Sequence, residues 1–193
     1  HGECTGCGGC GDARKRCRGE VRCAAGPYAV RMSATERSGD VRVGDAVPDF
    51  ERRDSQGGRF RLSEKRGACV VLFFYPKDFT PGCTAQSCAF RDSYEDFTAA
   101  GATVVGVSSD SDASHQGFAG KHRLPFTLIS DADGSLRRLL GVPRTLWLFP
   151  GRVTYVIGPD GVLRHVFNSQ INIGGHIKSA LEVVRSLSGA GKK

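Results

Sequence analysis

The chain has 193 residues, of which 39% are hydrophobic and 24% charged, and its formal net charge at pH 7 is +7. This length suits one compact domain with a tail, and no apolar run approaches the roughly 20 residues of a membrane-spanning helix, so we expect no membrane span. The basic residues are scattered among acidic ones without a nucleic-acid-binding motif, so we expect no nucleic-acid partner.

Residues 1–40 differ in composition from the rest of the chain. They are rich in Gly, Cys and Arg and have no apolar periodicity, which predicts a disordered or targeting leader. Because the chain begins with His1 and not Met, we expect it to be processed, truncated or a fragment. Five of its eight cysteines lie here, at Cys4, Cys7, Cys10, Cys17 and Cys23.

Two functions can be considered for this leader, and neither fits well. The closely spaced cysteines could supply thiolates to zinc, but a second well-spaced ligand pair is missing. The Arg-rich composition could belong to an organellar targeting peptide, but such peptides are poor in acids, and acidic residues such as Glu3, Asp12 and Glu20 are present.

From Val41 to about residue 188 the sequence predicts a folded domain, followed by a flexible tail at 189–193. Turn residues, continuous apolar runs and helical spacing define its elements. In chain order we expect a β-hairpin at 50–53 and 59–62, a buried strand at 69–75, a helix after Cys83 that ends at Gly101, a buried strand at 103–107, a helix at 113–122, a short strand at 126–129, a short helix at 135–140, a hairpin at 153–157 and 162–167, and a closing helix at 175–187.

The order of these elements predicts the fold class. Buried strands that alternate with helices imply a parallel portion of a sheet, and the antiparallel hairpin near the end makes that sheet mixed. The pattern is typical of a thioredoxin-like α/β sandwich, with a mixed central sheet flanked by helices and an N-terminal β-hairpin.

One segment, from Phe73 to Cys88, predicts a reactive thiol. A strand ends, a loop containing two prolines follows, and Cys83 stands where a helix begins. Unsatisfied N–H groups and the helix dipole favour negative charge at this position, and the thiolate is the nucleophilic form of cysteine. Thr80, in the same loop, could place a hydroxyl beside the sulfur. A single cysteine in this setting is more often structural, but Cys88 follows five residues later in the same predicted helix.

The spacing of Cys83 and Cys88 has a mechanical consequence. Residues five apart on an intact helix have Cα atoms about 8.5 Å apart. A disulfide tolerates a Cα separation of at most about 7 Å. If the two cysteines pair, the first turn or two of the helix must therefore unwind, which would expose the disulfide to a reductant.

At this segment the sequence resembles a known family. Pro76-x-x-x-Thr80-x-x-Cys83 is similar to the active-site motif of peroxiredoxins, and the second cysteine, Cys88, resembles that of the peroxiredoxin Q, or bacterioferritin comigratory protein, branch. The likeness covers roughly residues 43–187. It includes Gly-Asp-x-x-Pro-Asp-Phe at 44–50, Gly-Val-Ser-x-Asp at 106–110, Leu-Pro-Phe-Thr-Leu at 124–128 and Pro-Gly-Arg-x-Thr-Tyr-Val at 150–156.

The resemblance implies a thiol-dependent peroxidase that reduces hydrogen peroxide and organic hydroperoxides. Cys83 would attack the peroxide and become a sulfenic acid, and Cys88 would resolve it to an intramolecular disulfide. Thioredoxin or a similar dithiol would reduce that disulfide, and no metal or organic cofactor would be needed. Thr80 would hydrogen-bond the thiolate and the peroxide, and Arg152 would hold the thiolate ionised and orient the peroxide oxygens.

The resemblance also bears on assembly and location. Relatives in this branch are often monomeric, which implies a monomer here. The basic leader and the plant-like motifs suggest a chloroplast protein, with a bacterial-type cytoplasmic protein as the alternative. Residues 144–149 depart from the plant-type relatives, which tend to carry Gly and acidic residues there, so we expect a different peroxide mouth or partner surface.

Three other functions fit the residues less well than a peroxidase. A thiol–disulfide oxidoreductase would carry a Cys-x-x-Cys motif, but no cysteine follows Cys83 at plus three. A redox sensor or metal-binding protein would use the leader cysteines and show no steady peroxide turnover. A hydrolase would need a Gly-x-Ser-x-Gly elbow, which the sequence lacks. The remaining histidines are interpreted as surface or satisfied core residues without a role as base: His115, His122, His165 and His176.

Overall fold

The computed structural model describes residues 41–145 and 149–190. These residues belong to the second of the two units into which the chain divides, residues 37–193. The predictions for the leader at 1–40, including the zinc and targeting hypotheses, therefore lie outside the described residues. Among the helices of the described residues, none combines the length and the apolar character that a transmembrane segment requires.

A mixed sheet of five strands, in the order β5-β4-β3-β8-β9, forms the centre of the domain. Its strands are β3 (Cys69–Phe74), β4 (Ala102–Ser108), β5 (Thr127–Ser130), β8 (Val153–Ile157) and β9 (Leu163–Asn168). β4 runs parallel to both β3 and β5, whereas β8 runs antiparallel to β3 and β9. The predicted combination of a parallel portion with an antiparallel hairpin is confirmed.

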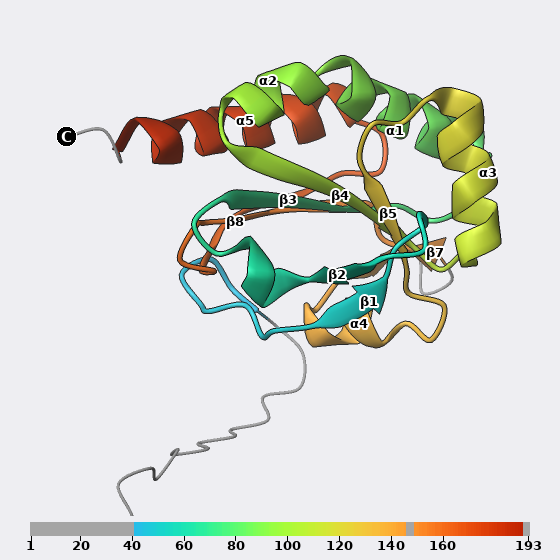
Figure 1. Ribbon diagram of the computed structural model, residues 1–193, viewed down its shortest axis with the longest axis horizontal. Helices are drawn as coiled ribbons and strands as arrows, with labels where there is room; N and C mark the ends of the chain where they lie inside the picture. The colour runs from blue at the N-terminus through green and yellow to red at the C-terminus, as the bar shows by residue number, and fades with distance from the viewer. Residues whose placement is uncertain (1–40, 146–148, 191–193) are drawn as a thin grey trace, which may run out of the picture. The chain divides into compact units, whose positions relative to one another are not determined.

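The two faces of this sheet are covered differently (Figure 1). Helices lie on one face, and the N-terminal hairpin with one short helix lies on the other (Figure 1). The first group is α1 (Pro81–Asp92), α2 (Tyr94–Ala99), α3 (Asp112–His122) and α5 (Ile173–Ala190). The second is β1 (Glu51–Arg53), β2 (Arg59–Arg61) and α4 (Ser135–Leu139). The structure adds three short elements that were not predicted: a 3-10 helix, η1 (Leu62–Lys65), and the two-residue strands β6 (Arg144–Thr145) and β7 (Phe149–Pro150).

Strand β3 explains why the sheet has a core on each side. Every residue of β3 is buried, and because side chains alternate along a strand, Phe73 enters the cluster under the helices while Phe74 enters the cluster under the hairpin. The Phe73 ring stacks on Phe90 of α1 with the ring centroids 4.2 Å apart. Full burial of such a side chain contributes about 2–3 kcal/mol. This contact fixes α1, the helix that carries both site cysteines, to the centre of the sheet.

The prediction of one helix from Cys83 to Gly101 was wrong in one respect. The structure has two helices there, α1 and α2, which meet at Ser93. Ser93 has φ −102° and ψ 8°, outside the helical region, so the chain changes direction between them. Both Phe90 and Phe97 remain buried in the same cluster, which is why the spacing of the aromatic residues suggested a single helix.

The closing helix α5 is longer than predicted at both ends. It begins at Ile173 because the side chain of Asn172 accepts a hydrogen bond from the backbone N–H of Gly175, with the two atoms 2.9 Å apart. It continues to Ala190, two residues into the predicted tail at 189–193, and the remaining residues 191–193 lie outside the described part.

Candidate active site

Cys83 lies in the first turn of α1, as the sequence predicts. The helix begins at Pro81, and the carbonyl oxygen of Thr80 accepts the backbone N–H of Thr84 at 2.8 Å. Backbone N–H groups of a first turn have no partner within the helix, so negative charge is stabilised there. The Cys83 side chain is 1% exposed, so its sulfur is shielded from bulk water beside these groups.

Arg152, which directly precedes β8, brings a positive charge to the same sulfur. Its Nη2 lies 3.6 Å from the Sγ of Cys83, and its Nη1 donates to the carbonyl oxygen of Gly82 at 3.1 Å. The guanidinium is buried, with Arg152 only 6% exposed, so water screens the interaction weakly. The fold thus joins two residues 69 positions apart and places a buried positive charge beside the Cys83 sulfur.

Two further residues determine the position of the Arg152 guanidinium, and the sequence analysis did not assign them roles. The buried side chain of Gln86 accepts a hydrogen bond from Arg152 Nη1 through its Oε1 atom. Gly82 leaves room for the guanidinium, because a Cβ at this position would lie 3.1 Å from Arg152 Nη2, a very tight contact. The sequence does show a Gln about one turn after the Cys at the helix start. It does not show that this Gln bonds to Arg152.

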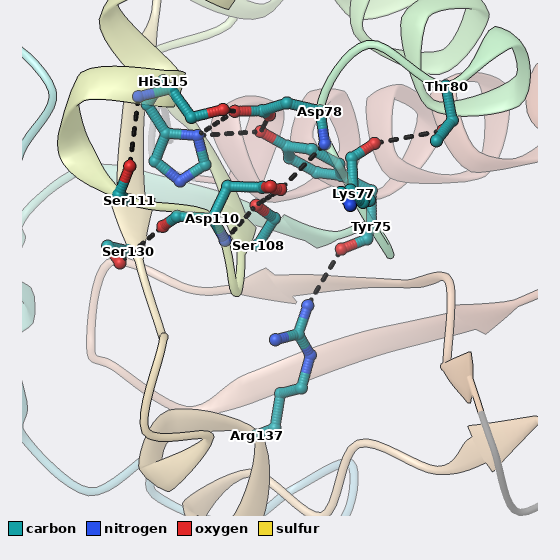
Figure 2. Close-up of polar contacts among 11 residues, drawn as sticks. Tyr75, Lys77, Asp78, Thr80, Ser108, Asp110, Ser111, His115, Ser130 and Arg137 are labelled. Carbon is teal, nitrogen blue, oxygen red and sulfur yellow. Dashed lines mark hydrogen bonds and ion pairs between the residues drawn. The ribbon is translucent and has the colours of Figure 1, made fainter.

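Thr80 caps the backbone of α1, but its hydroxyl points elsewhere. The Oγ1 atom donates to the carbonyl oxygen of Lys77 at 3.0 Å, a bond drawn in Figure 2. Among the described residues, no hydrogen bond joins Thr80 to Cys83. The side chain closes the turn that leads into the helix, and a direct contact with the thiolate or a peroxide stays a prediction.

Cys88 lies farther along α1 and is half-buried. Its Sγ is 4.0 Å from Nδ1 of His122 at the end of α3. Cys83 and Cys88 are both free thiols in this structure, as is Cys69. Cys69 is buried in β3, and burial raises the pKa of its thiol, which fits the prediction of an inert structural residue.

A buried polar cluster holds the loop between β3 and α1 in place (Figure 2). The carboxylate of Asp78 accepts hydrogen bonds from the hydroxyls of Tyr75 and Ser114, both at 2.8 Å, and from Nδ1 of His115 at 2.9 Å. The backbone N–H of Asp78 donates to the carboxylate of Asp110 at 2.8 Å. These bonds tie the loop both to the segment after β4 and to the first turns of α3.

Phe79, the residue after Asp78, has a strained backbone that these hydrogen bonds help to maintain. Phe79 has φ 58°, the left-handed conformation, which costs a non-glycine residue about 1–2 kcal/mol. Its ring packs edge-on against Phe118 at a centroid distance of 5.2 Å, and the Lys121 ammonium lies 5.6 Å from its centroid. The Asp78 bonds and these ring contacts sustain the sharp turn that delivers Thr80 to the start of α1.

Replacing Asp78 by Asn is expected to lower the free energy of unfolding by about 1–3 kcal/mol at neutral pH. Asn has one acceptor oxygen where the carboxylate has two, so some of the buried donors lose their hydrogen-bond acceptor. Burial by itself raises the pKa of Asp78, but the hydrogen bond and charge of His115, with the Tyr75 and Ser114 hydroxyls, outweigh it and hold the pKa below its ordinary value. The stability contributed by the ionised carboxylate is therefore fully present above about pH 4 and is lost as the pH falls through the lowered pKa. Urea unfolding of both proteins between pH 3 and pH 7 measures the difference.

The matched control is Glu182→Gln, a change of an exposed carboxylate on α5. It should leave the free energy of unfolding within about 0.5 kcal/mol of the wild type at neutral pH. If the free energies of unfolding of wild type and Asp78→Asn differ by the same amount at pH 3 and at pH 7, the ionised carboxylate of Asp78 does not contribute to stability.

Comparisons with known proteins agree with this geometry. The AhpC/TSA family matches residues 43–166. Peroxiredoxin Q, chloroplastic, of Oryza sativa subsp. japonica is 48% identical over 150 residues, which cover 77% of this chain and 69% of the rice protein. The protein of the same name from Populus jackii is 49% identical over 148 residues, which cover 76% of this chain and 70% of the poplar protein.

Solved structures give the same result. Peroxidoxin BcpB from Mycobacterium tuberculosis superposes with a TM-score of 0.71 at 38% identity, over 76% of this chain and 98% of that one. Peroxiredoxin Q from Xanthomonas campestris superposes with a TM-score of 0.70 at 30% identity, over 77% of this chain and 97% of that one. The thioredoxin-like architecture predicted from the sequence is therefore confirmed.

Proposed function

The chain belongs to the AhpC/TSA family, in its peroxiredoxin Q branch, and from this we propose that it is a peroxidase in which Cys83 attacks the peroxide and Cys88 resolves the product. Thiol-dependent peroxide reduction is the activity of this family, and the structure supplies candidates for each step. The observation that carries the assignment is the buried Arg152 guanidinium 3.6 Å from the Cys83 sulfur at the start of α1.

In the first step the Cys83 thiolate attacks one oxygen of the peroxide. The O–O bond breaks, the sulfur becomes a sulfenic acid, and the departing oxygen takes a proton and leaves as water or an alcohol. Arg152 would stabilise the thiolate and the negative charge that develops on the departing oxygen. Thr80 would turn its hydroxyl from Lys77 toward the bound peroxide.

The substrates we propose are hydrogen peroxide and organic hydroperoxides. A solved structure of the Xanthomonas campestris bacterioferritin comigratory protein, 29% identical to this chain, is described as giving insight into alkyl peroxide reduction. That description supports organic hydroperoxides as substrates here.

In the second step Cys88 condenses with the Cys83 sulfenic acid, forming a disulfide and releasing water. Thioredoxin or a similar dithiol protein then reduces the disulfide by thiol–disulfide exchange, which makes the chain an atypical two-cysteine enzyme. We propose that it acts as a monomer, because both cysteines lie on one helix and no second copy is needed to bring them together.

The names of its relatives indicate that the chain is a chloroplast protein. The peroxiredoxin Q proteins from rice, wheat, poplar and Arabidopsis thaliana that it matches are all named as chloroplastic. The plastid location expected from the sequence is thereby confirmed, and the cytoplasmic alternative is set aside.

The assignment of Arg152 is tested by replacing it with Ala and measuring thioredoxin-driven peroxide consumption. We expect the second-order rate constant for peroxide to fall by about 10²–10³-fold, the usual effect of removing one preorganised group that stabilises developing charge.

Arg185→Ala is the matched control, since Arg185 is an exposed arginine on α5 whose ion-pair partner among the described residues is the surface residue Asp96. It should behave like the wild type. A rate constant unchanged in Arg152→Ala would remove the arginine from the mechanism while leaving the roles of the cysteines open to their own tests.

A further inference from the structure

The half-buried Cys88 faces a histidine that the mechanism above does not use. Nδ1 of His122 lies 4.0 Å from the Cys88 sulfur, within the range of a hydrogen bond to sulfur. The two residues come from different helices, α1 and α3, and are 34 positions apart in the chain. Their contact is a product of the fold and not of local sequence.

The structure holds His122 in this position. It is the last residue of α3, and Arg123, which follows it, turns the chain with φ 52°. The His122 ring packs edge-on against Phe118 with the centroids 4.9 Å apart. From α1, Nη1 of Arg91 donates to the carbonyl oxygen of His122 at 2.9 Å, which ties the end of α3 to the helix that carries Cys88.

A positive charge also lies near Cys88 on its own helix. Arg91 follows it by three residues, on the same side of α1, and its pKa is raised first by its bond to Asp92 and then by the charge of Cys88. Asp92 is engaged by Arg91 at 2.8 Å. In the described part of the chain, α1 thus carries Arg91 and Asp92 about one turn beyond this thiol, and α3 places His122 beside it.

We propose that His122 is the base that activates Cys88 for the resolving step, with Arg91 stabilising the thiolate that results. This inference rests on the proposed function. The Cys88 thiol gives its proton to Nδ1 of His122, and the thiolate attacks the sulfur of the Cys83 sulfenic acid. The S–O bond breaks as the S–S bond forms, the departing hydroxide takes up a proton, and water leaves, so His122 returns to its neutral form.

The size of the effect follows from thiol chemistry. A free thiol with a pKa of about 8.5 is only about 3% ionised at pH 7. A tenfold gain in thiolate raises the rate by roughly 3-fold, because a stabilised thiolate is also a weaker nucleophile. Loss of His122 is therefore expected to slow disulfide formation by roughly 3-fold near neutral pH, and by less as the pH rises.

The test is a rapid-quench experiment on the full reduced chain, wild type and His122→Ala, mixed with hydrogen peroxide. Cys83 sulfenic acid and the Cys83–Cys88 disulfide are quantified by peptide-resolved mass spectrometry, so that the leader cysteines do not interfere. The assay is repeated from pH 6 to pH 9, with and without added imidazole. His165→Ala, the loss of a half-buried histidine on β9, is the matched control.

The inference predicts slower disulfide formation in His122→Ala at pH 7, convergence with the wild type at pH 9, and recovery on addition of imidazole, with His165→Ala matching the wild type. A rate equal to that of the wild type at pH 7 overturns it. So does a slower rate that neither converges at high pH nor responds to imidazole, because that pattern indicates a purely structural role. If the wild type forms no Cys83–Cys88 disulfide at all, the proposed function itself fails, and the two failures are thereby distinguished.

Discussion

Replacing Cys83 by Ser is expected to abolish peroxide consumption driven by thioredoxin. The serine hydroxyl is not ionised near neutral pH, so the buried Arg152 and the first turn of α1 would have no anion to stabilise. Serine is also close in size to cysteine, so the helix start should keep its geometry. The measurement is the rate of peroxide loss in the presence of a thioredoxin system, compared with the uncatalysed rate.

Cys69→Ala is the matched control for this loss. Cys69 is the other buried free thiol of the described chain, and it lies at the start of β3. Peroxide consumption should continue in this variant, with a moderate loss of stability because a small cavity is left. Steady turnover in Cys83→Ser would end the assignment of Cys83 as the attacking residue.

The sequence predicted most of the fold because its elements carry strong local signals. The apolar run of β3 and the turn residues between β8 and β9 are both unambiguous patterns, and the structure has these elements within a residue or two. The break at Ser93 was missed because the apolar spacing continues across it, and periodicity records which side is buried, not whether the backbone bends.

The site was only partly predictable. The position of Cys83 at a helix start follows from local pattern, but Arg152 could be named only through the family resemblance, because its approach to the sulfur depends on how β8 pairs with β3. The bond between Asp78 and His115 joins residues 37 positions apart, and no local rule connects them. Contacts of this kind depend on tertiary packing, which the sequence pattern does not specify.

The position of His122 beside Cys88 was also not predictable from the sequence. The sequence indicated a surface or satisfied core residue without a role as base, and only the packing of α3 against α1 places it beside Cys88.

Replacing Cys88 by Ser is expected to leave about one peroxide reduced per chain and then to stop turnover with thioredoxin. The sulfenic acid at Cys83 would form, but the thiol that converts it to a disulfide would be missing. A burst of peroxide loss close to the protein concentration, followed by a flat line, is the expected record. Continued turnover with thioredoxin as the only thiol would show that Cys88 is not required for resolution.

In the wild type, forming the Cys83–Cys88 disulfide must unwind the start of α1. The intact helix keeps the two Cα atoms about 8.5 Å apart, beyond the limit of about 7 Å for a disulfide. Unwinding breaks the bond from Thr84 N–H to Thr80 and the contacts of Arg152 with Gly82. The stacking of Phe90 on Phe73 lies past both cysteines and can hold the rest of the helix in place.

Amide hydrogen exchange of the reduced and oxidised wild type tests this directly. Exchange across residues 83–90 should be faster in the oxidised form, while β4, at the centre of the sheet, should be equally protected in both and serves as the internal reference. Cys88→Ser treated with peroxide is the control, because its Cys83 is oxidised without a disulfide and its helix should stay protected. Equal protection of residues 83–90 in both forms of the wild type, with the disulfide verified by mass spectrometry, would refute the unwinding, since the bond would then have formed across a helix whose geometry forbids it.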